Sequence, residues 1–412
     1  MTHRMSLRGI DTETWEKMDN QRGDTSREDF VRRLIRKHLF PDQPPQDQLP
    51  FVTEPTTVYG ELPFTFIDLF AGIGGFRCGL QALGGKCIYS SEWDKFAAKT
   101  YRHWYNDDVD QENFTRVVHS EVLPDHDILA AGFPCQPFSL AGVSKKQSLG
   151  RAHGFDDPDQ GNLFFAIRDA IEAKSPPVVF LENVKNLRSH DRHRTWEVIQ
   201  GTLEECGYHV FDEVIDLSGW IPQHRERIFI VCFRRDVFGE DRDQIGFRFP
   251  NRPTDTPKFG DILESDPDRK YMLSNDLWTY LKDYKAKHRA AGNGFGYGIA
   301  DRDGVSRTMS ARYHKDGSEI LIRQKGWRNP RRMTPSEAAQ LQGFDEEYSS
   351  RYGWPNGFPQ VVSDTQAYRQ FGNAVSPRIV EAIGREILPI LATRGIYETG
   401  NGTLLVGRKL AA

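Results

Sequence analysis

From residue 64 onward, short apolar runs alternate with segments in which apolar residues recur at helical spacing. Five of these runs are expected to form strands: 64–70, 86–90, 127–131, 178–181 and 228–233. Strand-like runs separated by helical segments are typical of a parallel sheet covered by helices. We therefore predict an α/β fold with a mostly parallel sheet and helices on both faces.

The pattern changes on either side of this region. After about residue 235 the alternation stops, and short turns rich in Gly, Arg, Tyr and Asp follow; we interpret 236–362 as a smaller, irregular domain. Residues 1–40 form a separate charged unit, and 41–60 hold five prolines, which predict an extended linker. The sheet domain is then expected to begin at about residue 61.

Composition narrows the class of protein. The 412 residues are long enough for two or three domains, and no segment resembles a signal peptide or a membrane span. The five cysteines are scattered and lack a Cys-x-x-Cys pair, which disfavours structural zinc and disulfides and favours a reducing cytoplasm. The net charge is −4, so any nucleic-acid contact must be local. Residues 307–332 hold eight basic residues against two acidic ones, a candidate phosphate-binding surface.

One cysteine stands directly after the apolar run 127–131. That run passes through Gly132 into a loop in which Cys135 lies between Pro134 and Gln136. Positions just past the carboxyl end of a buried strand are where α/β enzymes keep nucleophiles. A packed thiol is the ordinary alternative for a cysteine. Proline and glutamine do not belong in an apolar core, so we predict an exposed, reactive Cys135.

The loop around Cys135 resembles the Pro-Cys-Gln motif of the cytosine-5 DNA methyltransferases. Five further segments resemble motifs of that family and follow in the family's order: Asp68-Leu-Phe-Ala-Gly-Ile-Gly-Gly-Phe76, Phe180-Leu-Glu-Asn-Val184, Gln223-His-Arg-Glu-Arg227, Arg332-Met-Thr-Pro-Ser-Glu337 and Gln370-Phe-Gly-Asn-Ala-Val375. Several motifs in register rarely occur by chance. The chain is most similar to the Dcm-type bacterial and phage enzymes of the family.

The resemblance implies a domain organisation. Residues 61–235 would form a Rossmann-like, S-adenosylmethionine-dependent methyltransferase domain, and 236–362 a target-recognition domain. Residues 363–412 would complete the catalytic domain, with the helix from Ser376 onward packing on the sheet.

The glycine-rich segment after the first strand predicts a cofactor pocket. Gly72, Gly74 and Gly75 allow a tight turn into a helix, where the backbone can approach a ligand closely. NAD enzymes and purely structural turns share this pattern. Glu92 ends the next strand, where an acid can hold ribose hydroxyls, and Trp93 could stack on adenine. A core aromatic is the alternative for Trp93.

The resemblance identifies this cofactor as S-adenosylmethionine. Besides the glycines, it implies that these residues bind it: Phe70, Glu92, Trp93, Asn113, Pro134, Asn373 and Val375. Asn113 stands where the family usually has an acid for the adenine amino group. Either Asn113 or a nearby aspartate would fill that role, and the two alternatives stay open.

The resemblance also implies a reaction. Carbon 5 of cytosine is a poor nucleophile, and addition of the Cys135 thiolate to carbon 6 would activate it. Glu182 would protonate or hydrogen-bond nitrogen 3, which requires a raised pKa; an isolated Glu is more often a capping or surface acid. Arg227 would hold the cytosine carbonyl oxygen. Arg225 would support a phosphate or the loop.

The target base must be flipped out of the duplex to reach these groups. Residues 140–147 are the candidate lid over it. The residues that we expect to contact DNA are Gln136, Ser139, Lys145, Lys146, Arg307, Arg312 and Lys315. Residues 292–298 and 307–319 look like a Dcm-type recognition region, which implies a CC-containing palindrome such as CCWGG or CCNGG. A structural glycine-rich hairpin is the alternative.

Residues 1–40 suggest a strand and two helices, an order that resembles a ribbon-helix-helix repressor. Such a unit would dimerise and bind DNA; a small helical appendage is the alternative.

These patterns together predict a DNA (cytosine-5-)-methyltransferase of a restriction-modification system. It would act on double-stranded DNA beside a cognate endonuclease, at the prokaryotic nucleoid. One alternative is an RNA cytosine-5 methyltransferase, but those relatives carry a Cys-Phe-Thr signature and residues 236–362 contain no cysteine. The other is a DNA-binding repressor with an inactive methyltransferase domain. The intact Cys135, Glu182 and Arg227 argue against it.

Overall fold

The computed structural model describes residues 64–110, 123–133, 163–393, 396–398 and 404–406. They all belong to one unit that runs from Pro55 to Ala412. The expectations for the N-terminal unit, the linker and the lid fall outside the described residues.

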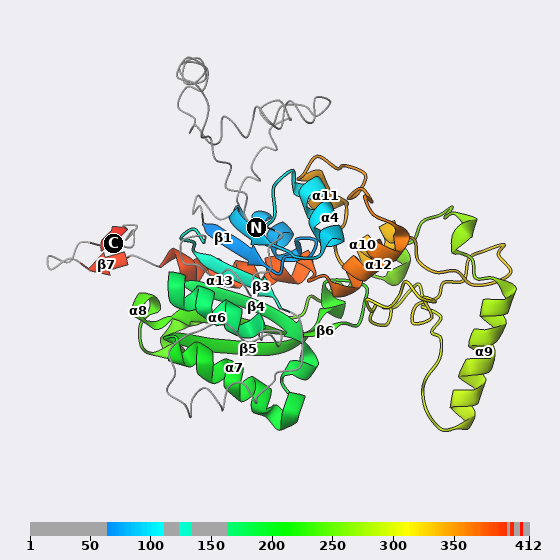
Figure 1. Cartoon of the computed structure of the whole chain (residues 1–412), viewed down its shortest axis with the longest axis horizontal. Helices are drawn as coiled ribbons and strands as arrows, with labels where there is room; N and C mark the ends of the chain where they lie inside the picture. Colours follow the sequence, from blue (N-terminus) through cyan, green and yellow to red (C-terminus); the bar gives the residue numbers. More distant parts are fainter. Residues whose placement is uncertain (1–63, 111–122, 134–162, 394–395, 399–403, 407–412) are drawn as a thin grey trace, which may run out of the picture. The chain divides into compact units, whose positions relative to one another are not determined.

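A six-stranded sheet forms the centre of this unit (Figure 1). Its strand order is β2-β1-β3-β4-β6-β5. The first four strands are mutually parallel, whereas β6 runs antiparallel to both of its neighbours. The prediction of a mostly parallel α/β sheet is confirmed. The strands are β1 Thr65–Leu69, β2 Lys86–Ser91, β3 Ile128–Gly132, β4 Val178–Val184, β5 Tyr208–Asp216 and β6 Glu226–Arg234.

Strand β5 is missing from the predicted set, so the expectation of five strands was wrong. It occupies one edge of the sheet and pairs only with β6. Its sequence carries His209, Asp212 and Glu213 among apolar residues. An edge strand tolerates such polar residues because part of it faces solvent, and they break the apolar run that marks a buried strand.

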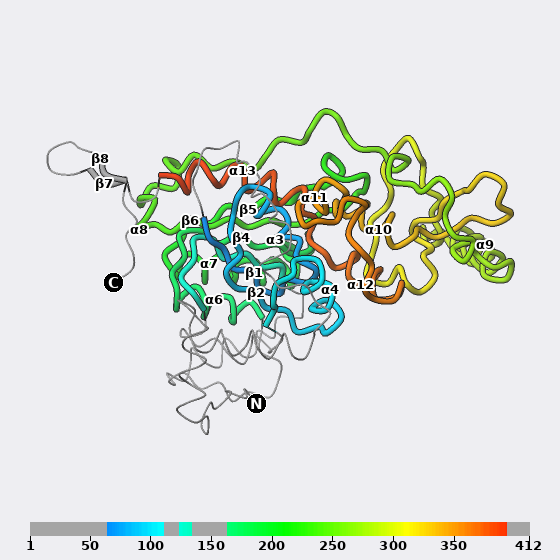
Figure 2. Tube along the Cα trace, turned by 90° about the horizontal axis from the view of Figure 1, so that it is seen from above, coloured from blue at the N-terminus to red at the C-terminus, as the bar shows by residue number. Residues whose placement is uncertain are grey.

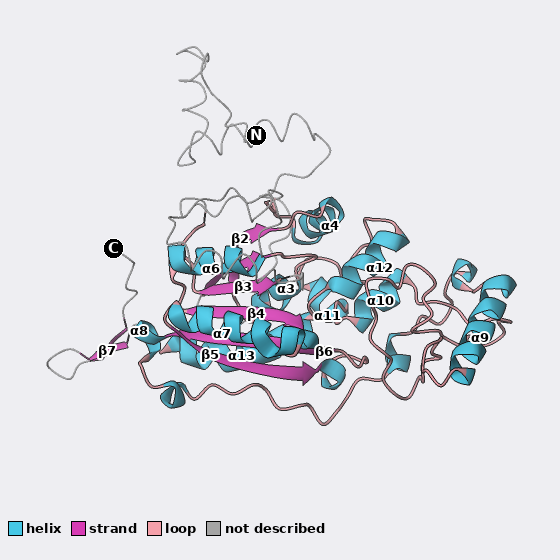
Figure 3. Ribbon diagram, turned by 60° about the horizontal axis from the view of Figure 1, so that its bottom comes forward, coloured by secondary structure: helices cyan, strands magenta, loops and turns pink. Residues whose placement is uncertain are grey.

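Helices cover both faces of the sheet (Figure 3). On one face, α6 and α7 pack over alternate residues such as Ile67 and Leu129. On the other face, α3 and α13 pack over Phe66 and Ile128. Successive strand residues point to opposite faces, which is why neighbours in sequence join different cores. The bounds are α3 Gly75–Gln81, α4 Lys95–Tyr105, α6 Leu163–Lys174, α7 Arg194–Glu205 and α13 Pro377–Ala392.

The C-terminal helix α13 returns to lie beside α3 (Figure 2). Its residues Ile379, Ile383 and Ile387 are fully buried in the core that also contains Phe76 and Leu80 of α3. Helix α13 therefore completes the core under the glycine-rich turn. After α13 come two short paired strands, β7 Ile396–Glu398 and β8 Leu404–Val406.

The region expected to be irregular contains more helix than its sequence suggested. It includes a 16-residue helix, α9, which begins after the N-cap residue Ser274. Only Leu281 of α9 is buried, so the helix lacks the broad apolar stripe that would have predicted it. The helices from this region onward are α8 Arg235–Phe238, α9 Asn275–Ala290, α10 Pro335–Leu341, α11 Glu346–Ser350 and α12 Asp364–Asn373.

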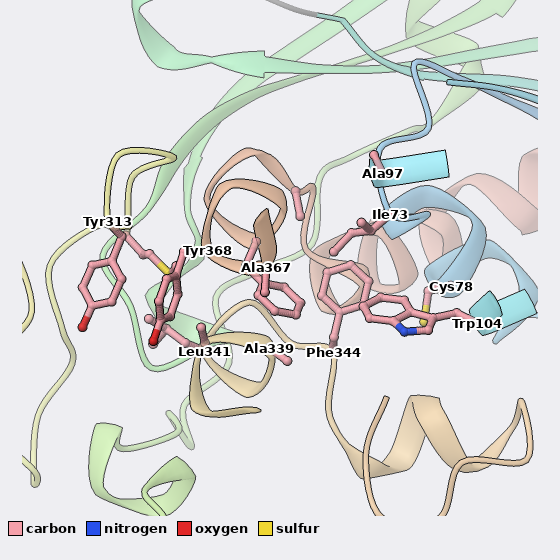
Figure 4. Packing of buried hydrophobic residues seen from close by; sticks show 14 of the residues in the cluster. Ile73, Cys78, Ala97, Trp104, Tyr313, Ala339, Leu341, Phe344, Ala367 and Tyr368 are labelled. Carbon is pink, nitrogen blue, oxygen red and sulfur yellow. The ribbon is translucent and has the colours of Figure 1, made fainter. Parts of the chain in front are cut away.

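A third buried cluster joins α4 to the segments after residue 308 (Figure 4). The Trp104 ring stacks on Phe358 with 4.4 Å between centroids, and Tyr313 meets Tyr368 at 5.1 Å. This cluster crosses the expected domain boundary at 362/363, so that boundary stays a proposal. Within the described ranges, no helix is both long and apolar enough to cross a membrane.

Candidate active site

Glu182 and Arg227, two of the sequence-predicted residues, lie at the edge of the sheet where β3 and β4 end. In the parallel register, Gly132 of β3 lies opposite Glu182 of β4. Strand β6 runs the other way, and its early residue Arg227 pairs with Val184 at the same edge. The carboxyl edge of a parallel sheet is where α/β enzymes bind ligands. Seven predicted site residues lie outside the described residues: Asn113, Pro134, Cys135, Gln136, Ser139, Lys145 and Lys146.

Glu182 and Arg227 form a nearly buried pair at this edge. Arg227 Nε lies 3.0 Å from Glu182 Oε1, and the two side chains are 14% and 10% exposed. Burial raises the pKa of the Glu182 carboxyl, and the positive charges of Arg227 and Arg225 oppose part of that rise. The alternative of a surface or capping acid for Glu182 is wrong.

Phe133, the residue that follows β3, is hydrogen-bonded to β4. Asn183 Nδ2 donates a hydrogen bond of 2.8 Å to the carbonyl oxygen of Phe133, the last described residue before the Pro-Cys-Gln run. Beside Arg227, a cavity of about 200 Å³ is lined by Val184, Lys185, Asn186, Glu226, Arg227 and Thr308.

The turn between β1 and α3 has the geometry of a ligand cradle. Phe70 and Gly72 adopt left-handed backbone conformations, with φ of 55° and 58°. A Cβ on Gly72 would meet no atom within 4 Å, so this glycine faces open space. Glu92 Oε2 accepts a 2.8 Å hydrogen bond from Gly72 N, and Oε1 accepts one of 2.7 Å from Asp94 N. Burial raises the pKa of Glu92, and these two bonds oppose the rise.

The other two glycines approach protein rather than open space. A Cβ on Gly74 would lie 2.4 Å from the Tyr105 ring, and one on Gly75 would lie 2.1 Å from Val375 O. Tyr105 was missed by the sequence reasoning. The single proton of its buried hydroxyl is shared between Ile73 O at 3.0 Å and Gly74 O at 2.9 Å, which fixes the turn. The spacing of Tyr105 from the glycines carried no signal of this contact.

Trp93 and the segment after α12 complete the cradle. Trp93 is 71% exposed, so the alternative of a core aromatic is wrong. Asn373 is exposed at the end of α12, and Val375 Cγ2 lies 2.9 Å from the position of a Cβ on Gly132. The described residues therefore bring Val375 to the end of β3 and to α3. An exposed indole beside a buried acid and an open glycine suits a nucleoside, which has an aromatic base and ribose hydroxyls.

Arg225 is not placed to touch a phosphate, so that alternative was wrong. Its side chain is 1% exposed. The guanidinium donates to three backbone carbonyls: Met309 O at 3.2 Å, Gly372 O at 3.0 Å and Ala374 O at 3.0 Å. Within the Gln-x-Arg-x-Arg segment, Arg225 supports loops, and Arg227 faces Glu182.

The basic stretch 307–332 needs one correction. Arg331 is fully buried and forms a two-bond ion pair with Glu337, at 2.7 Å for each bond. It holds the first turn of α10 and cannot belong to a phosphate-binding surface. Arg307, Arg312 and Lys315 are exposed, as a DNA contact requires.

Solved structures share this fold. One is a DNMT2 mutant from Spodoptera frugiperda, with a TM-score of 0.59, 20% identity, and coverage of 80% of this chain and 99% of that chain. Another is the Entamoeba histolytica methyltransferase EhMeth, with a TM-score of 0.59, 18% identity, and coverage of 80% and 98%. At these identities the likeness concerns the fold alone. The fold is that of a methyltransferase.

Sequence comparison narrows this class. The family model of C-5 cytosine-specific DNA methylases matches residues 64–389. The DNA-cytosine methyltransferase of Escherichia coli K12 is 42% identical over 82% of this chain and 80% of its own length. The Type II methyltransferase M.NlaX of Neisseria lactamica is 45% identical over 80% and 97%. The chain belongs to the C-5 cytosine-specific DNA methylase family and is a DNA (cytosine-5-)-methyltransferase.

Proposed function

We propose that the enzyme methylates carbon 5 of a cytosine flipped out of a short palindromic DNA site, with S-adenosylmethionine as donor. The observation that carries the proposal is the nearly buried Glu182–Arg227 pair at the carboxyl edge of the sheet. A carboxyl whose pKa is raised can hold the proton that nitrogen 3 of cytosine needs, and a guanidinium beside it can hold the neighbouring carbonyl oxygen.

The proposed reaction begins with the Cys135 thiolate, which adds to carbon 6 of the cytosine. Glu182 donates to nitrogen 3 as the ring accepts the electron pair, and carbon 5 becomes nucleophilic. Carbon 5 would then gain the methyl group, with S-adenosylhomocysteine as the leaving group. Loss of the carbon-5 proton, departure of the Cys135 thiolate and return of the nitrogen-3 proton to Glu182 would restore the aromatic ring. Asn183 positions the nucleophile loop through its bond to Phe133 O.

The cofactor proposal rests on the cradle around Gly72. Glu92 is oriented by two backbone amides and keeps lone pairs for ribose hydroxyls, and Trp93 offers its exposed ring to adenine. S-adenosylmethionine supplies an electrophilic methyl group when bound. Phe70, Asn373 and Val375 are proposed to complete this site, together with Pro134 and Asn113 outside the described residues.

The recognition site is proposed to be a CC-containing palindrome such as CCWGG or CCNGG. Exposed arginines can read guanine edges in the major groove, which suits Arg307 and Arg312. Lys315 would meet a phosphate. Gln136, Ser139, Lys145 and Lys146 are proposed as contacts from the nucleophile loop.

A restriction-modification role is supported by the relatives, of which several are named Type II methyltransferases, including M.SsoII of Shigella sonnei at 44% identity. We propose a cognate endonuclease that cuts the same site, and action on DNA in the prokaryotic cytoplasm. Dimerisation through residues 1–40 is a further proposal.

The proposal is tested by expression in a host that lacks DNA methylation, followed by bisulfite sequencing of the plasmid. Protected cytosines are expected at one short palindrome. They should be lost in Cys135→Ala and retained in Cys206→Ala, which removes a thiol at the end of α7. No protection at any short palindrome with the unaltered enzyme would refute the proposed recognition site.

A further inference from the structure

We propose that Arg225 is a positioning residue that couples DNA recognition to cofactor binding, so that each ligand strengthens the binding of the other. The inference rests on the proposed function, because it takes S-adenosylmethionine and the recognition segment as that function assigns them. It assigns to Arg225 a role that requires no contact with base, phosphate or cofactor.

The guanidinium bridges two segments that are far apart in sequence. Through Nη1 it binds the carbonyl of Met309, two residues after Arg307 in the proposed recognition segment. Through Nη2 it binds the carbonyls of Gly372 and Ala374, which flank the proposed cofactor residue Asn373. One rigid, planar group thus sets the distance between the recognition segment and residues 372–375, called the cofactor loop below.

Gln223, two residues earlier, strengthens the recognition side of this bridge. It is fully buried, and its Oε1 accepts a 2.7 Å hydrogen bond from Met309 N. Its Nε2 donates to Leu341 O at the end of α10 at 3.3 Å. Met309 is therefore held at both its amide and its carbonyl by side chains of one segment, so it cannot shift without disturbing Arg225.

Two close backbone approaches continue the same path. A Cβ on Gly372 would lie 2.4 Å from Ala311 N, so the recognition segment packs directly on the end of α12. A Cβ on Gly75 would lie 2.1 Å from Val375 O, so the cofactor loop packs directly on the start of α3. Close backbone contacts thus connect the recognition segment to the glycine-rich turn through residues 372–375.

The burial of Arg225 explains why the bridge transmits a shift. A buried guanidinium is stable only while its donors are satisfied, and Nε already lacks a partner among the described residues. Displacement of either segment would remove further bonds from the charge. The arrangement therefore favours states in which both segments are in place together, and by linkage each ligand then favours the other.

The experiment measures the dissociation constant of S-adenosylhomocysteine by calorimetry, with and without a duplex that contains the methylated site found by bisulfite sequencing. For the unaltered enzyme the duplex is expected to tighten binding about fivefold or more. Arg225→Met should reduce the ratio of the dissociation constants without and with the duplex to about one. Arg225→Lys, which cannot bridge both segments, should reduce this ratio as well. Gly372→Ala is an independent variant that separates α12 from Ala311, and it should also lower the ratio.

The matched control is Arg331→Lys. Arg331 is another fully buried guanidinium, but its partners Gln324, Arg332 and Glu337 all lie in one stretch of chain. The Arg331→Lys variant should have lower thermal stability, but its ratio of dissociation constants without and with the duplex should be unchanged. An unaltered enzyme with no duplex effect, variants that keep the ratio, or a control that loses it would each overturn the coupling. Failure of the unaltered enzyme to bind S-adenosylhomocysteine at all would instead overturn the proposed cofactor.

Discussion

Glu182 illustrates how the chemistry of a single residue depends on its surroundings. Its carboxyl is nearly buried at the end of a strand, and the cost of desolvating the charged form raises its pKa. Arg227, 3.0 Å away, limits the rise and fixes the direction of the carboxyl. A raised pKa and a defined orientation are the two properties that general acid catalysis would need from this carboxyl.

The raised pKa of Glu182 leads us to expect that the stability of the protein depends on pH. Between the ordinary Glu value of 4.5 and the higher folded value, the folded state binds more protons than the unfolded state. The contribution of Glu182 to stability is therefore fully present below pH 4.5 and is lost as pH rises through the folded pKa.

Urea unfolding at a series of pH values should show the unaltered enzyme losing stability relative to Glu182→Gln as pH rises through this window. Glu197→Gln, at an exposed position on α7, controls for the loss of one carboxylate. A difference between the unaltered enzyme and Glu182→Gln that stays constant with pH would contradict the prediction.

At the scale of elements, glycines decide where α3 can pack. Helix α13 and the segment before it reach α3 only because Gly75 and Gly79 present no side chain; a Cβ on Gly79 would lie 2.7 Å from Pro377 O. Helix α3 and the turn before it are thus positioned by α13 and the segment before it, which lie about 300 residues further along the chain.

A pair of substitutions tests this packing. Gly75→Ala should destabilise the protein by about 1–3 kcal/mol, because its methyl group would overlap the backbone at Val375. It should also weaken cofactor binding. The measurements are chemical denaturation and the dissociation constant of S-adenosylhomocysteine.

The matched control is Gly201→Ala, inside α7, where a Cβ would meet nothing within 4 Å. It should be neutral or stabilise the helix by up to about 1 kcal/mol. Equal losses of stability in the two variants would show that packing at Val375 is not the cause.

At the scale of the whole molecule, the net charge is −4, so the positive charge that DNA binding needs must be concentrated on one part of the surface. Removal of Arg331 from the candidate surface leaves the exposed residues Arg307, Arg312 and Lys315 beside Arg323, Lys325 and Arg328. Arg307 and Arg312 lie next to Met309 and Ala311, which contact Arg225 and Gly372, so DNA binding at these two arginines would act on the packed path to the cofactor loop.

If Lys315 meets a phosphate, Lys315→Ala should weaken binding to every DNA sequence about equally and reduce the slope of log affinity against log salt by about 1. Lys99→Ala, at an exposed position on α4, should leave the slope unchanged. Fluorescence anisotropy with cognate and unrelated duplexes at several salt concentrations provides the measurement. A loss confined to the cognate duplex would instead assign Lys315 to base recognition.

The amino-acid sequence alone was enough for the sheet class, the family and the position of the candidate site. Alternating apolar runs predict a mostly parallel sheet because a strand buried on both faces must be apolar throughout. The motif order places Glu182 and Gly72 at strand ends, and parallel strands carry their carboxyl ends to one edge. These inferences needed only local pattern and chain order.

Which side chains are buried, and which partners they bond, depended on the folded chain. Arg225, Arg331 and Arg307 are the same residue type, yet the first braces two loops, the second pairs with Glu337 and the third is exposed. Strand β5 is paired despite its polar residues, and Tyr105 closes a turn about 30 residues away, as contacts between distant segments commonly do in packed cores. The side-chain type sets which bonds a residue can make, but its neighbours in space, which come from distant parts of the chain, set which bonds it does make.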